Sequence, residues 1–213
     1  MVLPRACLFV DGSNFYHGLK QNGLFGKFKY DQLLSVLSKH YNVKNIYFYD
    51  AIKNFRIEPE QYAKQQAFHA RLMNAIPNLV IRARKLQYVF SNQKLENAQK
   101  KAKFCEKCSP KIKPFLHEAG LIRSTKEKGV DVLLVADMIK GAFQNRYEVA
   151  LLASGDADFV PAVELVQNLK KEVINIHVYT GSSSELRMAS NEHVLVQLGE
   201  SDEVILTQRG KQL

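Results

Sequence analysis

The stretch LFVDGSN, residues 8–14, decides how the rest of the chain is interpreted. An apolar run stops abruptly at Asp11 and continues as Gly12-Ser13-Asn14. This pattern is typical of a buried strand that ends in a turn, because these residue types form turns and Asp often caps a following helix. We expect Gly12 and Ser13 to form that turn. The pattern equally fits a metal or phosphate site at the end of a strand.

Strand-like apolar runs alternate with helical patterns along the chain. Strands are expected at residues 7–10, 43–50, 79–84, 148–153, 173–179 and 192–198, and helices at 31–40, 58–75, 130–143, 158–170 and 184–190. This alternation predicts right-handed crossovers and a mainly parallel sheet with helices on both faces, which is an α/β fold. We expect one domain over residues 1–200, with an insertion at about 85–127 and a polar tail over 201–213.

The composition narrows the class of protein. The chain has 213 residues, and none of its apolar runs approaches the roughly 20 residues of a membrane span. Its three cysteines are too few for a disulfide framework. The expectation is therefore a cytoplasmic protein without a membrane partner.

The positive charge is concentrated in one segment. The formal net charge is +9, and residues 82–128 hold 13 Lys and Arg against 4 Glu. The rest of the chain is balanced. This distribution is typical of an electrostatic footprint for nucleic acid, although a charge run is also common on an ordinary solvated surface.

Four carboxylates are predicted to meet at one edge of the sheet. Asp11 ends the first strand, Asp156 and Asp158 follow the strand of residues 148–153, and Asp131 begins the helix that leads into that strand. Ligands of parallel α/β sheets gather at the carboxyl ends of the strands. Carboxylates held together repel unless a cation lies between them, and Mg²⁺ or Mn²⁺ prefers such oxygen ligands.

Each of these residues also has a purely structural interpretation. Asp11 with Asn14 fits a turn and cap, Asp131 fits a helix amino end, and Asp156-Ala157-Asp158 fits a cap of the next helix. Asp137 lies about 240° around the helix from Asp131, so we expect it on a different face.

Three blocks of the sequence resemble a known family. FVDGSNFYHGL, EKGVDVLLVADMI and LLASGDADFVPAVELV resemble, in order, the signature blocks of the NYN domain, a branch of the PIN-like nuclease superfamily also described as LabA-like or DUF88. The resemblance runs from about Leu8 to Gln197. It implies a PIN-like three-layer α/β/α sandwich and a divalent-metal-dependent ribonuclease. The run Met188-Ala189-Ser190-Asn191 departs from the family pattern, in which an Asp often follows two small residues.

The resemblance extends to the candidate site residues. Asp11 and Asn14 match the first block, Asp131 the second, and Asp156 and Asp158 the third. All five are candidate catalytic residues. The four aspartates would hold Mg²⁺ or Mn²⁺, and Asn14 would position a phosphate or a water. The favoured function is hydrolysis of RNA. The alternative is a non-catalytic nucleic-acid-binding or regulatory module that has kept the acidic pocket.

Further residues are candidates for binding RNA. Ser182 and Ser183 follow a strand and begin a helix, which suits phosphate or, in the structural interpretation, a capping box of Ser182 with Glu185. The basic candidates are Arg82, Arg84, Lys85, Lys100, Lys101, Lys103 and Lys128.

Cys105 and Cys108 form a single CxxC motif, which is half of a zinc site. Zinc takes four ligands, and His117 would supply a third, with a second subunit completing the set in a homodimer. A redox pair or two reduced thiols explains the motif equally well.

Overall fold

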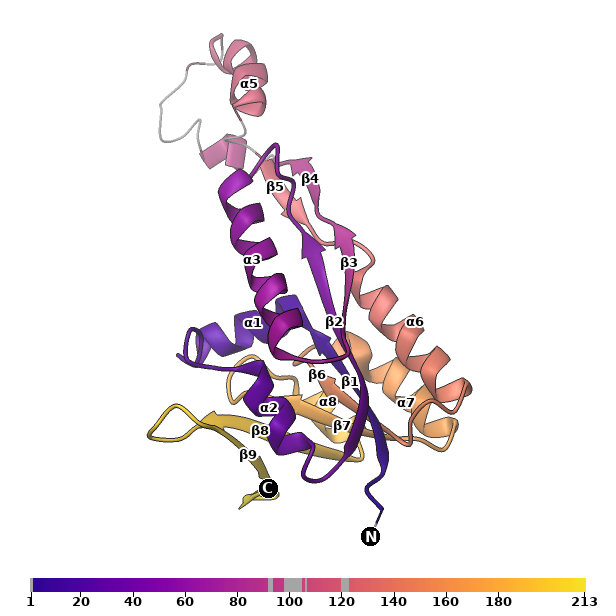
Figure 1. The fold of residues 1–213 in the computed structure, drawn as a ribbon. Coiled ribbons are helices and arrows are strands. Elements are labelled where there is room, and N and C mark those ends of the chain that lie inside the picture. Colours follow the sequence, from indigo (N-terminus) through magenta and orange to yellow (C-terminus); the bar gives the residue numbers. More distant parts are fainter. Residues whose placement is uncertain (1, 92–93, 98–104, 106, 120–122) are drawn as a thin grey trace. The chain divides into compact units, whose positions relative to one another are not determined.

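The computed structural model describes residues 2–91, 94–97, 105, 107–119 and 123–213 (Figure 1). By their internal contacts these residues divide into two compact units. The first comprises 1–50, 66–83 and 129–213, and the second comprises 51–65 and 84–128. Among the described residues, no helix is both long and apolar enough to cross a membrane.

The first unit contains an eight-stranded sheet, and the last residues of its strands β2 and β3 belong to the second unit. Its order is β10-β9-β8-β7-β6-β1-β2-β3. The strands span β1 Arg5–Asp11, β2 Asn42–Ile52, β3 Leu79–Lys85, β6 Val149–Ala153, β7 Glu172–His177, β8 Glu192–Leu198, β9 Val204–Gln208 and β10 Lys211–Gln212. Strands β2, β1, β6, β7 and β8 pair in parallel. The α/β fold with a mainly parallel sheet is therefore confirmed.

Helices cover both faces of this sheet, as Figure 1 shows for α1 and α2 on one face and α6 and α7 on the other. The helices are α1 Gly12–Gln21, α2 Tyr30–Leu37, α3 Pro59–Ala75, α6 Val130–Phe143, the 3₁₀ turn η1 Ala157–Phe159, α7 Val160–Asn168 and α8 Ser184–Ala189. Along β1, Leu8 and Val10 pack with Phe15 and Leu19 of α1. Since successive strand residues point to opposite faces, Asp11 shares the other face with Cys7 and Phe9.

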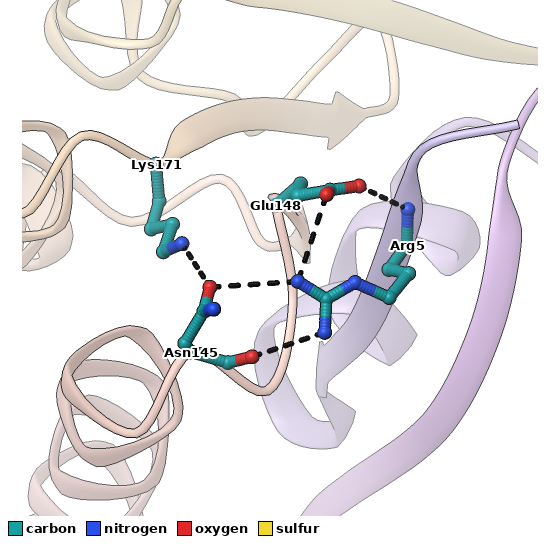
Figure 2. Close-up of polar contacts among 4 residues, drawn as sticks. All are labelled: Arg5, Asn145, Glu148 and Lys171. Carbon is teal, nitrogen blue, oxygen red and sulfur yellow. Dashed lines mark hydrogen bonds and ion pairs between the residues drawn. The ribbon is translucent and has the colours of Figure 1, made fainter.

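The amino edge of the sheet carries a polar cluster, drawn in Figure 2. The Arg5 backbone N–H donates to Glu148 at 2.8 Å, and its guanidinium contacts Asn145 and Glu148. Lys171 Nζ donates to Asn145 Oδ1. These contacts tie the starts of β1, β6 and β7 together, at the edge opposite to the carboxyl ends of the strands.

Two segments differ from the sequence expectation. The predicted turn at Gly12 and Ser13 is wrong, because α1 begins at Gly12 and Asp11 is its N-cap. Gly12 is required there: a Cβ would lie 2.5 Å from the Tyr49 carbonyl oxygen. In the segment expected as a polar tail, β9 pairs antiparallel with β8 and buries Val204 and Leu206, because its apolar residues alternate with period two.

The second unit contains the residues expected as an insertion. Strands β4 Gln87–Phe90 and β5 Arg123–Lys126 form an antiparallel pair, and α5 spans Ser109–Glu118. Within this unit Tyr88 Oη accepts from the Asn54 N–H and donates to Glu58. The ring of Tyr88 is thus held by its own hydrogen bonds.

Candidate functional site

Asp11 ends the central strand β1 at the carboxyl edge of the sheet, next to β6 as expected. Its side chain is only 3% exposed. One oxygen accepts the Asn14 backbone N–H at 3.2 Å, as an N-cap does, and the other accepts the Ser154 hydroxyl at 3.0 Å. The cap interpretation of Asp11 is confirmed, and it places the carboxylate at the amino end of α1.

Ser154 links the two neighbouring strand ends. Its hydroxyl, fully buried, donates to Asp11 and accepts the Asp156 N–H at 3.2 Å. A second link runs beside it, where Asn14 Oδ1 accepts the Gly155 N–H at 2.7 Å. These bonds join the segment after β6 to the start of α1, so the two acidic blocks have a fixed relation to each other.

Asn175 of β7 supports this link from within the sheet. Its amide nitrogen donates to the carbonyl oxygens of Leu152, at 3.2 Å, and Ser154, at 2.8 Å. The side chain is fully buried, and its Oδ1 has no hydrogen-bond partner among the described residues. Sequence reasoning missed both Ser154 and Asn175. The signal for Asn175 was a lone amide inside the apolar strand VINIHVY.

Asp156 and Asp158 lie in the 3₁₀ turn that follows β6. Asp156 is the N-cap of η1, and its Oδ1 accepts the Asp158 N–H at 3.0 Å. Asp156 is half-buried and Asp158 is exposed. The cap interpretation is therefore confirmed here as well, and it leaves both carboxylates at the carboxyl edge.

Asp131 lies in the first turn of α6, the helix that leads into β6. Partial burial and the charges of Asp156 and Asp158 raise the pKa of the Asp131 carboxyl. The effect shows that three carboxylates from two separate segments lie within electrostatic range, because like charges disfavour each other's ionised forms. The repulsion involves Asp131, Asp156 and Asp158; that Asp11 joins them in one site stays a prediction.

These oxygen donors suit a hard divalent cation in chemical type. Across the described part of the chain, however, no three His, Cys, Asp or Glu side chains are close enough together to hold a metal ion. The residues fit Mg²⁺ or Mn²⁺ in their chemistry, but they do not form a closed set of ligands.

Asp137, six residues further along α6 than Asp131, pairs with Arg82, one of the basic candidates. Arg82 Nε and Nη2 each donate to Asp137 at 2.9 Å, and the Tyr49 hydroxyl donates to it at 3.1 Å. Partial burial opposes ionisation of Asp137, but these two donors outweigh it and lower the pKa of its carboxyl. The Arg82 charge is thereby largely offset within the protein.

The loop after β7 contacts the segment that follows β6 at the carboxyl edge of the sheet. Ser183 N–H donates to the Gly155 carbonyl oxygen at 2.8 Å, and a Cβ on Gly155 would lie 2.3 Å from the Gly181 oxygen. The predicted capping box of Ser182 with Glu185 is wrong: Ser183 is the N-cap of α8, and Ser182 Oγ accepts from Arg187. Both hydroxyls are already used by α8, because its amino end lies one residue later than the pattern suggested.

Two histidines, buried His177 and exposed His193, meet beside this loop. His177 Nδ1 lies 3.0 Å from the Val178 carbonyl oxygen, and its Nε2 lies 3.1 Å from His193 Nδ1. Since the carbonyl can only accept, His177 donates from Nδ1 and accepts from His193. Burial lowers the pKa of His177 to about 4, which keeps this imidazole neutral.

The remaining candidates belong to the second unit or lie outside the described residues. Arg84, Lys85 and Lys128 are exposed. Cys105 and Cys108 are exposed free thiols, and a hydrogen bond from Cys108 lowers the pKa of Cys105. Lys100, Lys101, Lys103 and the side chain of His117 lie outside the description, so the zinc site stays a prediction.

Comparison with known proteins identifies the family and the fold of the chain. The family model described as NYN domain matches residues 5–197. A crystal structure of a protein of unknown function from Vibrio parahaemolyticus RIMD 2210633 is similar in fold, with a TM-score of 0.61 and 20% sequence identity over 95% of this chain and 96% of that one. No functionally curated protein matches the chain.

Proposed function

The chain belongs to the NYN domain family, which lies within the PIN-like nuclease superfamily, and on this basis we propose that it is a divalent-metal-dependent ribonuclease. The observation that carries the proposal is the placement of Asp131 at the start of α6 and of Asp156 and Asp158 in the turn after β6, close enough for their charges to raise the pKa of Asp131. A mutual repulsion of this kind costs stability, and perturbed ionisable groups of this kind cluster at functional sites.

Asp11, Asp131, Asp156 and Asp158 would hold Mg²⁺ or Mn²⁺. Such an ion lowers the pKa of a bound water and stabilises the charge that develops when a phosphodiester is cleaved. Asn14 has a distinct part in this proposal. Its Oδ1 is fixed by the Gly155 N–H, so its Nδ2 donors are oriented and available to a phosphate oxygen.

RNA is the proposed substrate. The net charge of +9 favours a polyanion, and binding through phosphate contacts predicts an affinity that falls steeply with salt. Arg84, Lys85 and Lys128 are exposed and suited to such contacts. Location in the cytoplasm and a homodimer remain predictions from the sequence.

The proposal is tested by cleavage of a fluorescent 30-nucleotide single-stranded RNA in Mn²⁺. We expect cleavage that is abolished by EDTA and reduced at least a hundredfold in Asp156→Asn, which keeps the capping geometry because Asn also caps helices. Asp31→Asn, which changes a carboxylate in the first turn of α2, should cleave like the wild type. A folded, Mn²⁺-loaded protein that leaves diverse RNA pools intact would refute the enzyme.

One observation favours the non-catalytic alternative. Asp11 and Asp156 already serve as helix caps, and among the described residues no complete set of metal ligands is formed. In a binding or regulatory module, RNA affinity would be the same with EDTA and with Mn²⁺. It would also be unchanged in Asp156→Asn.

A further inference from the structure

The solvent face of α1 carries an aromatic and basic stripe. Phe15 and Leu19 are buried against the sheet on the opposite face of this helix. Residues three and four apart share one face of a helix, which aligns the stripe along Ser13, Tyr16, His17 and Lys20. Because α1 begins at Gly12, directly after Asp11, the stripe leads away from the acidic edge.

Phe25 folds back onto this stripe. Its ring lies 4.8 Å from the ring of Tyr16 at an interplanar angle of 78°, and Tyr16 also contacts the ring of His17 at 5.3 Å. The pair nevertheless stays open to solvent, with Tyr16 37% and Phe25 54% exposed. Single exposed aromatic residues are common. Two in mutual contact, beside a candidate site, form a preorganised apolar surface.

The segment that carries Phe25 is tied to the candidate site. Asn22 Nδ2 donates to the Thr180 carbonyl oxygen at 2.9 Å, and the Thr180 N–H donates to Asn22 Oδ1 at 2.9 Å. Thr180 belongs to the loop whose Ser183 is bonded to Gly155. The position of Phe25 is therefore coupled through one loop to the segment that carries Asp156 and Asp158.

We propose that Tyr16 and Phe25 form a stacking surface for the unpaired bases of single-stranded RNA, next to the acidic edge. This inference rests on the proposed function. Aromatic faces bind bases irrespective of sequence, and Lys20 adds a positive charge that suits the RNA backbone. Tyr16 follows Asp11 by five residues, about 7.5 Å along a helix axis. A base on this surface and a phosphate at the acidic edge can thus belong to one short RNA segment.

The chain contains no tryptophan, so a single substitution reports on this surface alone. Phe25→Trp places an indole at the stacking surface. Phe143→Trp is the matched control: Phe143 is 79% exposed but ends α6, at the amino edge of the sheet. The probes are a 12-nucleotide oligouridylate, its duplex with oligoadenylate, and an abasic 12-mer, all in EDTA to prevent cleavage.

We expect the oligouridylate to quench the Phe25→Trp fluorescence and to leave the Phe143→Trp fluorescence unchanged. The duplex and the abasic strand should require at least tenfold higher concentrations. Tyr16→Leu should weaken oligouridylate binding about tenfold, within the range of alanine substitutions at stacked bases. In Mn²⁺ the same variant should raise KM for RNA cleavage and leave kcat unchanged.

The proposal is overturned if Phe25→Trp does not respond to oligouridylate, whether the RNA binds elsewhere or not at all. It is also overturned if the abasic strand quenches equally well. The two proposals fail separately. RNA that quenches the indole but is never cut in Mn²⁺ refutes only the nuclease, whereas RNA that is cut while the indole stays unchanged refutes only the stacking surface.

Discussion

Replacing Asp131 by Asn should stabilise the protein in the absence of metal, relative to a matched change elsewhere. Asp131 and Asp31 both lie in the first turn of a helix, α6 and α2. A carboxylate at that position gains about 0.3–1 kcal/mol from the helix dipole, and Asp31→Asn loses this amount. Asp131→Asn loses the same amount but also removes a charge that is partly shielded from water and is repelled by Asp156 and Asp158.

The magnitude follows from the exposure of these groups. Asp131 and Asp158 are exposed, and water screens exposed charge pairs to about 0.2–1 kcal/mol each. The repulsion of Asp131 by Asp156 and Asp158 together therefore lowers the free energy of unfolding by about 1 kcal/mol. In a chain of 213 residues this corresponds to about 2–4 °C in Tm. Differential scanning calorimetry in EDTA at low salt should find Asp131→Asn more stable than Asp31→Asn by this amount.

Mn²⁺ should reverse this order. At ten times its Kd, the ion adds about 1.4 kcal/mol to the stability of a protein that binds it only when folded. The wild type and Asp31→Asn should gain this amount, and Asp131→Asn should gain little. Equal Tm values for the two variants in EDTA would refute the repulsion. An equal Mn²⁺ response in both would refute a metal site that includes Asp131.

Three further predictions concern stability. Because burial lowers the pKa of His177 from 6.5 to about 4, its neutral form contributes stability that is complete above pH 6.5 and is lost as the pH falls to 4. The loss amounts to about 3 kcal/mol of unfolding free energy. In His177→Asn, urea titrations at pH 7 and pH 4 should show a much smaller difference in unfolding free energy. Gly155→Ala should cost about 1–3 kcal/mol or more, seen as a lower urea midpoint, because its Cβ would lie 2.3 Å from the Gly181 oxygen. Glu148→Gln should lower Tm slightly, and less so in high salt, because its ion pair with Arg5 is exposed. RNA cleavage rates should not change, because this pair lies at the edge of the sheet opposite to the acidic one.

The central sheet and its acidic edge were predictable because each depends on local patterns and on one topological rule. Apolar runs in the sequence indicated the strands β1 and β6, and helical patterns indicated the crossovers between strands. Ligands gather at the carboxyl ends of parallel strands, and this rule placed Asp11 and Asp156 at the same edge. The pattern failed for α1. Gly12 and Gly18 interrupt its buried stripe, and these glycines are needed because the helix lies close to Tyr49 and Val178. That contact depends on tertiary packing and has no local signature.

The hydrogen bonds between side chains on neighbouring strands could not be predicted from the sequence, because they too depend on tertiary structure. Ser154 meets Asp11 because β1 and β6 pair with Val10 opposite Ala153, and Asn175 reaches Ser154 because of the register of β7 against β6. A shift of one residue in either register would point these side chains to the opposite face. The identity of each residue was visible in the sequence, but the partner was set by pairing.

The two kinds of carboxylate at this edge have different physical roles. Asp11 accepts hydrogen bonds from the Ser154 hydroxyl and the Asn14 N–H, so its carboxylate oxygens have partners within the protein. At Asp131, no hydrogen-bond donor among the described residues offsets the repulsion from its acidic neighbours. A cation bound at this edge would relieve the repulsion at Asp131, whereas the Asp11 carboxylate is held by its hydrogen bonds with or without an ion.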